Sequence, residues 1–426
     1  MRVLYSILYA LAFFLGSPYW LVRGMVNRNF LRTMKARILG PGRILPKMSG
    51  VPRIWVWALS LGEVLSARKL VATLLESKVE VVISATTQTG LAIARSLWPT
   101  LVVLPSPLDF RMSTRNFVKQ VEPDFLILVE TDIWPRILEE LKKRSIPASL
   151  VSARLSPRSY RNYKLIKPFW SKVLSNFETI AVQSQEDLEK FENLGVAPER
   201  MLVTGNLKFD VDPFDFGPNA REALLEKTGW PDGRYILLGS SHPGEESLIL
   251  SIFKGLAEVH PLLRLIIAPR DVPKFEKVWE LINQSFPGRA GRRSMPSTDD
   301  KEALVFLLDT LGELANFYSL ADLAIIGKSF PGRHEGGGHN PLEAAISGCP
   351  VITGPQVHNF KWVYKALVKA GGALVTDSQK LSGLMASLLN DPLKLKEMGE
   401  KGRNFVLANR GSVAKTLEFI RPPKGQ

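Results

Sequence analysis

The sequence is poor in cysteine and histidine. Cys349 is its single cysteine, so no intramolecular disulfide can form, and a reducing compartment is favoured. The single cysteine and five histidines show none of the short Cys/His spacings that bind zinc. Repeats of solenoid length and low-complexity tracts are also missing, which excludes repeat architectures and leaves an ordinary globular composition.

Acidic residues are in deficit as well. The chain has 55 Lys+Arg against 41 Asp+Glu, a formal net charge of +14. Such an excess indicates anionic partners, which can be nucleic acid, an acidic membrane or phosphorylated substrates, although a basic surface can also serve solubility alone. No helix-turn-helix, zinc-finger or RNA-binding signature is present. We therefore expect no nucleic-acid partner.

Charge is missing altogether from a long run near the N-terminus. Residues 4–22 (LYSILYALAFFLGSPYWLV) carry no charged side chain, a length that can just span a bilayer or lie in its interface. Tyr19 and Trp20 suit an aromatic belt, and the basic residues that follow predict that the main body stays in the cytoplasm. A cleaved signal peptide is the alternative, but the n-region is poor and no small-x-small site is convincing. We predict a membrane anchor helix with a basic flank over residues 1–37.

From residue 53 onward, short apolar runs alternate with amphipathic stretches, which predicts parallel sheets covered on both faces. The alternation of strands and helices is interrupted at residues 210–219 (DVDPFDFGPN), a linker rich in Pro, Gly and Asp, and resumes after it. We predict two doubly wound α/β domains, residues 38–210 and 211–426, facing a central cleft. In such folds ligands bind beyond the carboxyl ends of the strands.

The expected strands and helices follow from this pattern. Strands are expected at 54–58, 80–85, 101–104, 125–129, 148–151 and 179–182, and then at 235–238, 265–268, 303–307, 323–326, 351–353 and 373–375. Helices in the first domain are expected to include 64–75, 111–121 and 134–144.

Three motifs of the first predicted domain place charged residues where apolar segments end. In Ser60-Leu61-Gly62-Glu63, Glu63 is either a capping-box residue that binds the Ser60 backbone or a general base displayed over the cleft. Glu130 directly follows an apolar strand and is a site candidate, while Asp132 or Thr131 suits the cap of the next helix. Lys208 either neutralises a developing phosphate charge or is a solvated linker residue.

The second predicted domain contains a glycine-rich turn. Gly336-Gly337-Gly338 precedes Asn340-Pro341-Leu342-Glu343, in which Pro341 suits the first helical position and Asn340 with Glu343 forms a capping pattern. Glycines before a helix N-terminus leave backbone N–H groups available to a phosphate. Two further candidates, Pro269-Arg270 and Leu311-Gly312-Glu313, follow a strand and open a helix, respectively.

Taken together, these motifs resemble one family, the 3-deoxy-D-manno-oct-2-ulosonic acid (Kdo) transferases of lipopolysaccharide assembly. The resemblance runs nearly from end to end and includes the N-terminal anchor. Its segments are SLGEVLSA at 60–67, SATTQTG at 84–90, LVETDIWP at 128–135, SARLSPRSY at 152–160, VQSQEDLEKFENLG at 182–195, VTGNLKFD at 203–210, SHPGEE at 241–246, LGEL at 311–314, GGHNPLEAA at 337–345 and GPQVHNF at 354–360.

The resemblance implies a GT-B fold and an inverting transferase without a metal or cofactor, on the cytoplasmic face of the inner membrane. The implied donor is CMP-Kdo and the implied acceptor is a lipid A precursor (lipid IVA). Carried over by motif, Glu63 is the general base, and Glu130 and Lys208 assist the transition state. The residues implied to hold the CMP moiety are Pro269, Arg270, Leu311, Gly312, Glu313, Asn340, Pro341, Leu342 and Glu343.

Some positions depart from the family pattern. Lys328 stands where the family usually has glycine, the segment before the Gly-Gly-His is longer than usual, and Leu311 replaces a typical methionine. These changes affect the expected geometry of the phosphate loop over residues 327–338 but not the expected reaction class.

A basic, aromatic segment lies outside these motifs. Residues 158–172 (RSYRNYKLIKPFWSK) form either a surface that meets the acidic lipids of the inner membrane or a solvated helix with its aromatic residues in the core.

Two other functions compete with Kdo transfer. One is a GT-B transferase with a UDP-sugar donor, and the other is a non-catalytic membrane-binding scaffold, against which the joint retention of Glu63, Glu130, Lys208 and Arg270 argues.

Overall fold

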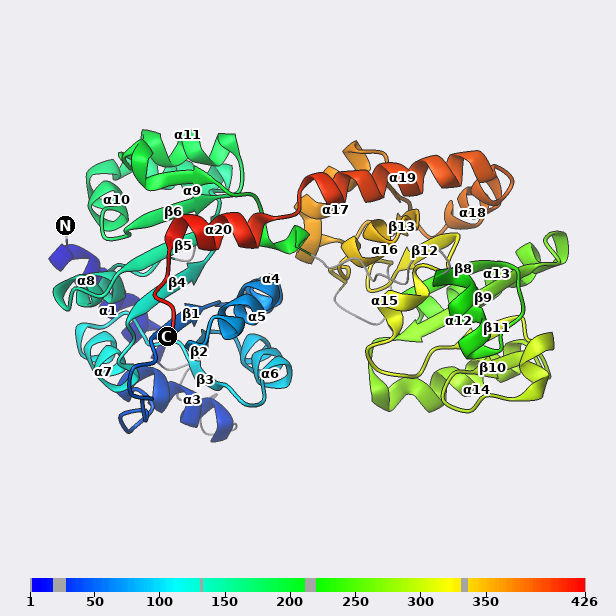
Figure 1. Cartoon of the computed structure of the whole chain (residues 1–426), viewed down its shortest axis with the longest axis horizontal. Helices are drawn as coiled ribbons and strands as arrows, with labels where there is room; N and C mark the ends of the chain where they lie inside the picture. Colours follow the sequence, from blue (N-terminus) through cyan, green and yellow to red (C-terminus); the bar gives the residue numbers. More distant parts are fainter. Residues whose placement is uncertain (1, 18–27, 131–132, 211–219, 331–335, 426) are drawn as a thin grey trace. The chain divides into compact units, whose positions relative to one another are not determined.

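The computed structural model describes residues 2–17, 28–130, 133–210, 220–330 and 336–425 (Figure 1). The chain divides into two compact units, and the structure of each is described by itself. Unit 1 contains Met1–Asp210 together with Gly411–Gln426, and unit 2 contains Val211–Arg410. The predicted boundary near residue 210 therefore agrees with this division, whereas the assignment of residues 411–426 to the second domain was wrong.

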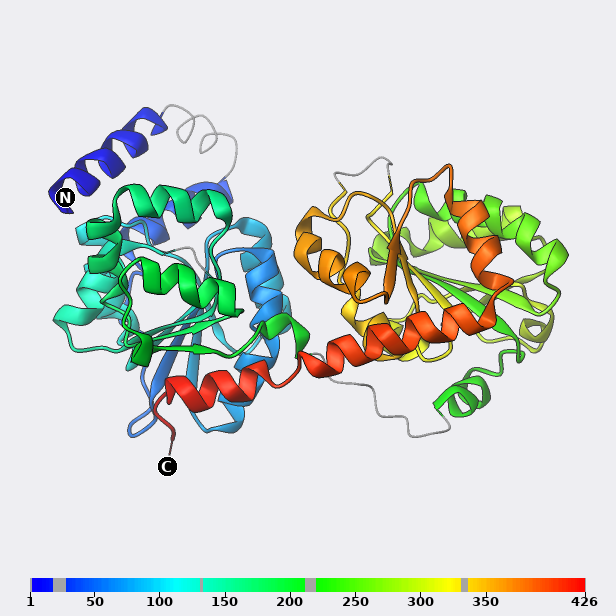
Figure 2. The same ribbon diagram turned by 90° about the horizontal axis from the view of Figure 1, so that it is seen from above.

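The last helix, α20 (Ser412–Ile420), explains that correction. Its residues Val413 and Ile420 are buried in a core of unit 1, and the Asp210 carboxylate accepts hydrogen bonds from the backbone N–H groups of Gly411 and Val413. The red α20 accordingly lies among the elements of unit 1 in both views (Figures 1 and 2). An amphipathic helix shows from its sequence which face it buries but not which sheet receives that face.

Unit 1 is built on a seven-stranded parallel sheet in the order β3-β2-β1-β4-β5-β6-β7. Its strands are β1 (Arg53–Trp57), β2 (Glu80–Ala85), β3 (Val102–Pro105), β4 (Phe125–Val129), β5 (Ala148–Ala153), β6 (Thr179–Val182) and β7 (Met201–Val203). Its helices are α1 (Arg2–Leu15), α3 (Arg28–Leu39), α4 (Leu61–Ser66), α5 (Arg68–Glu76), α6 (Gln88–Leu97), α7 (Arg111–Val121), α8 (Pro135–Lys143), α9 (Pro157–Leu165), α10 (Lys167–Leu174), α11 (Gln185–Asn193) and α20.

Side-chain alternation along the strands distributes the apolar residues over two cores. On β1, Trp55 and Trp57 join a cluster with residues of α7, α8, α10 and α11, whereas Ile54 and Val56 join a cluster with residues of α4, α5, α6 and α20. Successive side chains of a strand point to opposite faces, so a strand buried on both faces is apolar throughout. The predicted sheet with helices on both faces is confirmed for this unit.

Unit 2 is built on a second seven-stranded parallel sheet, in the order β10-β11-β9-β8-β12-β13-β14. Its strands are β8 (Arg234–Ser241), β9 (Leu263–Pro269), β10 (Ala290–Arg292), β11 (Val305–Leu307), β12 (Leu323–Ile326), β13 (Val351–Thr353) and β14 (Ala373–Val375). Its helices are α12 (Ala220–Thr228), α13 (Glu245–Val259), α14 (Phe275–Ser285), α15 (Leu314–Phe317), α16 (Leu342–Ile346), α17 (Lys361–Lys369), α18 (Leu381–Leu389) and α19 (Pro392–Ala408).

The predicted elements differ from the observed ones in a few places. The strands predicted at 80–85, 125–129, 179–182, 323–326, 351–353 and 373–375 have the observed bounds. The short strands β7 and β10 were not predicted; two of the three residues of β7 are exposed, and β10 (Ala-Gly-Arg) contains no apolar run. The helix predicted at 64–75 is two helices, α4 and α5, which meet at Ala67.

The N-terminal helix α1 packs against unit 1 through one face. Tyr5 stacks on Phe169, Tyr9 contacts Phe110 and Trp134, and the opposite face leaves apolar side chains exposed. Within the described residues, no helix has the length and apolar character needed to cross a bilayer. Residues 18–22 of the predicted anchor lie outside the described part of the chain.

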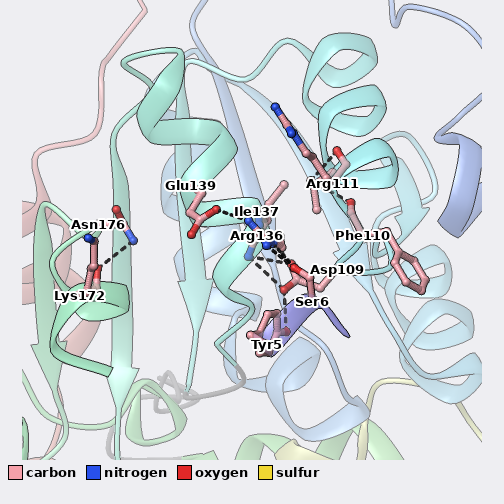
Figure 3. A network of polar contacts seen from close by, with 11 residues as sticks. Tyr5, Ser6, Asp109, Phe110, Arg111, Arg136, Ile137, Glu139, Lys172 and Asn176 are labelled. Carbon is pink, nitrogen blue, oxygen red and sulfur yellow. Dashed lines mark hydrogen bonds and ion pairs between the residues drawn. The ribbon is translucent and has the colours of Figure 1, made fainter. Parts of the chain in front are cut away.

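A buried carboxylate, Asp109, holds α1 to the body of unit 1 (Figure 3). It accepts a hydrogen bond of 2.7 Å from the Tyr5 hydroxyl and bonds of 3.0–3.1 Å from the backbone N–H groups of Arg136 and Ile137 at the start of α8. The Arg136 Nε in turn donates to Ser6 Oγ at 2.9 Å. Burial raises the pKa of Asp109 to about 6, although the bonds from Arg136 and Tyr5 oppose the rise.

We expect Asp109→Asn to remove one component of the pH dependence of stability. The pKa of Asp109 is about 6 in the folded protein and about 3.9 in the unfolded chain. Wild type therefore has the full stability contribution of protonated Asp109 below about pH 3.9 and loses it as the pH rises through about 6. The asparagine amide can accept from both N–H groups and donate to Tyr5. Relative to wild type, the variant should therefore gain about 2 kcal/mol in free energy of unfolding between pH 4 and pH 7. Denaturant titrations at several pH values measure this difference; a constant difference would contradict the assignment.

Candidate active site

The candidate catalytic residues of unit 1 lie at the topological switch point of its sheet. Strands β1 and β4 are neighbours although β2 and β3 separate them in sequence, and the connections from these two strands run to opposite sides. Glu63 lies on α4, directly after β1, and Glu130 directly follows β4. Ligands of doubly wound sheets bind at this point, beyond the carboxyl ends of the strands.

Glu63 forms the capping interaction that its sequence context suggests. Its Oε2 atom accepts the backbone N–H of Leu59 at 2.5 Å and that of Ser60 at 3.1 Å. Both of these bonds go to one carboxylate oxygen, and the side chain is only half-buried. The structural role is therefore present, and it leaves a partly exposed carboxylate at the strand end. The role of general base stays a prediction.

Glu130 and Lys208 form a nearly buried ion pair. Lys208 Nζ lies 2.6 Å from Glu130 Oε1, and the two side chains are 8% and 11% exposed. The residues are 78 positions apart in sequence. The 3-10 turn η2 (Leu207–Phe209), which carries Lys208, packs against α4, the helix of Glu63. The fold therefore places the ion pair next to the helix that carries Glu63, and Lys208 is not a solvated linker residue.

Local backbone geometry supports this pair. Glu130 has a φ of +60°, a left-handed conformation that costs a non-glycine residue about 1 kcal/mol or more. The backbone N–H of Lys208 donates to the Asn206 side chain at 2.9 Å, which caps the turn. Non-glycine residues in such conformations cluster at functional sites. Thr131 and Asp132, the neighbours of Glu130, lie outside the described residues.

Arg154 is a member of this cluster that the sequence motifs did not single out. It follows β5, and its Nε lies 3.7 Å from Glu130 Oε2. The sequence could have indicated Arg154 as a site residue, because its motif SARLSPRSY begins at the end of a predicted strand, as the other motifs do. An arginine among serines and a proline is common at a solvated loop, which is why composition alone did not mark it.

In unit 2, the equivalent switch point lies between β8 and β12. His242 follows β8, Lys328 follows β12, and the Nε2 atoms of His242 and His339 lie 3.0 Å apart. Burial lowers the pKa of His339 to about 3, and Arg270, His242 and Lys328 lower it further, so its imidazole is neutral near pH 7. The Glu245 carboxylate accepts the backbone N–H groups of Lys328, Ser329, Phe330 and His242. This carboxylate thereby holds the ends of both strands.

The glycine-rich turn of unit 2 requires glycine for steric reasons. Gly336, Gly337 and Gly338 all have positive φ values, and a Cβ on Gly337 would lie 2.3 Å from the Asn359 side chain. The Asn340 side chain accepts the backbone N–H of Leu342 at 3.1 Å, although Pro341 and not Asn340 is the N-cap residue of the following helix. Helix α16 nevertheless begins at Leu342, one residue later than predicted for Pro341. Residues 331–335 of the phosphate loop lie outside the described part of the structure.

The other predicted nucleotide-binding residues differ in exposure. Arg270 and Leu311 are exposed, while Pro269, Pro341 and Leu342 are buried. Glu313 is paired with Arg293 at 3.0 Å and accepts a bond from the Thr310 hydroxyl at 2.5 Å; although burial opposes them, these interactions lower the pKa of Glu313. The segments follow β9, β11 and β12, strands of one parallel sheet in which β8 lies between β9 and β12, so they lie beyond the carboxyl ends of its strands. Their binding of CMP stays a prediction.

Two doubly wound parallel units with polar residues at their switch points are the architecture of the GT-B fold. Solved structures with this fold include MurG of Acinetobacter baumannii (TM-score 0.54, 13% identity, 87% of this chain and 99% of that chain). They also include the UDP-GlcNAc 2-epimerase of Neisseria meningitidis (TM-score 0.52, 14% identity, 87% and 99%). Residues 300–405 match the family model of group 1 glycosyl transferases.

Sequence comparison identifies the family within this class. Residues 32–211 match the family model of 3-deoxy-D-manno-octulosonic-acid transferases. The Haemophilus influenzae 3-deoxy-D-manno-octulosonic acid transferase is 32% identical over 87% of this chain and 86% of its own length. The enzyme of the same name from Bordetella pertussis is 31% identical over 86% of each chain. The chain belongs to the Kdo transferase family, as its motifs predicted.

Proposed function

We propose that this Kdo transferase moves Kdo from CMP-Kdo to a lipid A precursor, with inversion at the anomeric carbon. The observation that carries the proposal is the Glu130–Lys208 ion pair beside the helix of Glu63, at the switch point of unit 1. Ligands of doubly wound sheets bind at this point, beyond the carboxyl ends of the strands. The family to which the chain belongs supports the transferred sugar.

Glu63 accepts the proton of the acceptor hydroxyl as that oxygen attacks the anomeric carbon of Kdo. The bond from this carbon to the phosphate oxygen of CMP breaks, and CMP leaves with the electron pair. A positioned carboxylate base typically contributes about 10²–10⁴-fold to such a step. Lys208, oriented by Glu130, stabilises negative charge near the reacting centre, and the residues of unit 2 from Pro269 to Glu343 hold the nucleotide.

The proposed reaction uses no metal ion. Over the described ranges, no group of three or more His, Cys, Asp or Glu side chains is arranged as a metal site. The charge of the leaving phosphate is instead balanced by cationic side chains and by the backbone N–H groups of the glycine-rich turn. Activity that persists after exhaustive treatment with a chelator is the expected result.

We propose further that unit 1 binds the cytoplasmic face of the inner membrane. Helix α1 exposes Ile7, Leu8, Leu11, Phe14 and Leu15 on the side that faces away from the unit. Amphipathic helices with such a face insert into the boundary between headgroups and acyl chains. These side chains support attachment by a helix that lies in the interface.

Helices α9 and α10 supply the basic part of the proposed membrane surface. Phe169 is buried, and Tyr163 stacks on Trp170 with ring centroids 3.7 Å apart, so these aromatic residues belong largely to the core of unit 1. Leu165 is 82% exposed, and the basic residues of the segment are exposed as well; these are Arg158, Arg161, Lys164, Lys167 and Lys172. Exposed basic residues beside an exposed leucine suit anionic headgroups.

Neutralising Lys164 and Lys167 together should weaken binding to anionic vesicles about 10- to 30-fold at low salt, because each lysine near such a surface contributes about 1 kcal/mol. Sedimentation with phosphatidylglycerol vesicles measures the effect. The control variant, Lys394→Gln/Lys396→Gln on α19, removes the same charge from exposed positions of unit 2. Equal binding by wild type and the Lys164/Lys167 variant would exclude this surface.

The proposed reaction is tested by incubating the full-length protein with CMP-Kdo and lipid A precursor and measuring product masses. A mass increase by one or more Kdo units is expected. CMP, but not UDP, should raise the melting temperature, which separates the proposal from a UDP-sugar transferase. Absence of any product with an intact fold and intact vesicle binding would favour the scaffold alternative.

A further inference from the structure

Arg154 lies at the carboxyl end of β5, beside the Glu130–Lys208 pair. Its side chain is 44% exposed, whereas Glu130 and Lys208 beside it are nearly buried. The Glu130 carboxylate is contacted by Lys208 at 2.6 Å through one oxygen and by Arg154 at 3.7 Å through the other. The Glu130 carboxylate thus lies between two cationic side chains.

The backbone on either side of Arg154 is held rigidly. Ser152 has a φ of +53°, and the pairing of β5 with β6 is irregular between Leu150 and Ala153. The Gln183 side chain donates to the Ser152 carbonyl at 2.8 Å and contacts its hydroxyl at 3.2 Å. Irregular pairing of this kind redirects the side chains that follow, and it recurs next to active sites.

The residue after Arg154 is fixed as well. Leu155 is 3% exposed, its N–H donates to Asp187 Oδ1 at 3.0 Å, and its carbonyl accepts from Lys190 Nζ at 3.1 Å. The chain thus immobilises the positions on both sides of an exposed arginine. A guanidinium on a fixed backbone is arranged in advance to bind, since little conformational freedom remains to be lost.

We propose that Arg154 binds an oxyanion of a substrate, either a phosphate of the acceptor or the carboxylate of the transferred sugar. This inference rests on the proposed function. The Arg154 side chain is 44% exposed beside the Glu130–Lys208 pair, so its guanidinium is accessible to an incoming anion. Lys208 compensates the charge of Glu130 and thereby limits repulsion of an incoming anion. Guanidinium groups bind phosphates and carboxylates in a planar, two-point geometry.

The test measures the binding of each substrate alone. Dissociation constants for lipid A precursor in detergent micelles, for CMP-Kdo and for CMP are compared between wild type, Arg154→Ala and Arg154→Lys. We expect Arg154→Ala to weaken the binding of one anionic substrate about 10- to 100-fold, with Arg154→Lys intermediate because it keeps the charge without the two-point geometry. The binding of CMP, which has no sugar carboxylate, should not change.

Arg144→Ala is a matched control in the same unit. Arg144 is an exposed arginine at the end of α8 whose Nε pairs with a buried glutamate, Glu140, at 2.9 Å. Loss of this pair resembles the loss of the Arg154–Glu130 contact, but it lies at a helix end rather than at the candidate site. We expect it to leave all three dissociation constants unchanged.

Each outcome decides the inference. Weaker binding of the lipid alone identifies the acceptor phosphate, and weaker binding of CMP-Kdo alone identifies the sugar carboxylate. Unchanged affinities in Arg154→Ala overturn the inference and leave the proposed function intact. If wild type binds the substrates but transfers nothing, the proposed function fails while the comparison of affinities still decides the role of Arg154. If wild type binds neither substrate, the proposed function and the role of Arg154 are both refuted.

Discussion

Glu63→Gln is expected to lower kcat for Kdo transfer by about 10²–10⁴-fold, the usual contribution of a positioned general base. The substitution preserves the shape of the side chain, and the amide oxygen can still accept the N–H groups of Leu59 and Ser60 that Oε2 binds. The free energy of unfolding should therefore change by less than about 1 kcal/mol, the typical value of a helix cap. The KM values should change little, because the base acts on the reacting proton.

The control for this prediction separates capping from catalysis. Thr87 caps the neighbouring helix α6, and its side chain accepts the Gly90 N–H at 3.0 Å. Thr87→Ala should cost about 1 kcal/mol of stability while kcat stays near the wild-type value. Initial rates at saturating substrate and thermal unfolding together measure both variants. Full activity of Glu63→Gln would refute the assignment of Glu63 as the base and limit it to capping.

Lys208→Met is expected to lower both stability and activity. Removing the ammonium leaves Glu130, 8% exposed, as a nearly buried carboxylate whose other contact is the distant Arg154. Breaking a buried pair in this way costs about 3–5 kcal/mol, an upper estimate here because Arg154 compensates part of the charge. Loss of a cation that stabilises developing charge should lower kcat by about 10²–10³-fold.

A double variant distinguishes these two effects. Glu130→Gln/Lys208→Met replaces the pair by neutral side chains of similar volume, so most of the lost stability should return. The rate should not return, since the cation is still missing. Denaturant unfolding and single-turnover rates give the two quantities. Recovery of the rate in the double variant would show that Lys208 only neutralises Glu130.

The sequence predicted the fold closely because both units repeat a strong local pattern. Strands buried on both faces, such as Phe125–Val129, are continuous apolar runs between polar segments, so their bounds were recognisable. Met201–Val203, two of whose three residues are exposed, was missed, whereas the equally short but fully buried Val351–Thr353 was predicted. The helix break at Ala67 was missed since alanine is a favourable residue throughout a helix.

The candidate site was partly predictable, for a different reason. Glu63 and Glu130 follow predicted strands, and the carboxyl ends of parallel strands meet at one edge. Arg154 occupies the same kind of position but lies in a segment whose composition resembles a solvated loop. The Lys208–Glu130 pair could be suspected from the family resemblance, but the contact itself joins residues 78 positions apart and needs the strand order.

By itself, the sequence determined the class of fold, the approximate division near residue 210 and the family, because these depend on local periodicity and on short motifs in fixed order. Only the tertiary structure decided that β4 lies beside β1, that α20 returns to unit 1 and that Arg154 joins the Glu130–Lys208 pair. The physical reason is that an apolar face specifies burial but not its partner. Partners are chosen by packing between residues far apart in the chain, which no local pattern records.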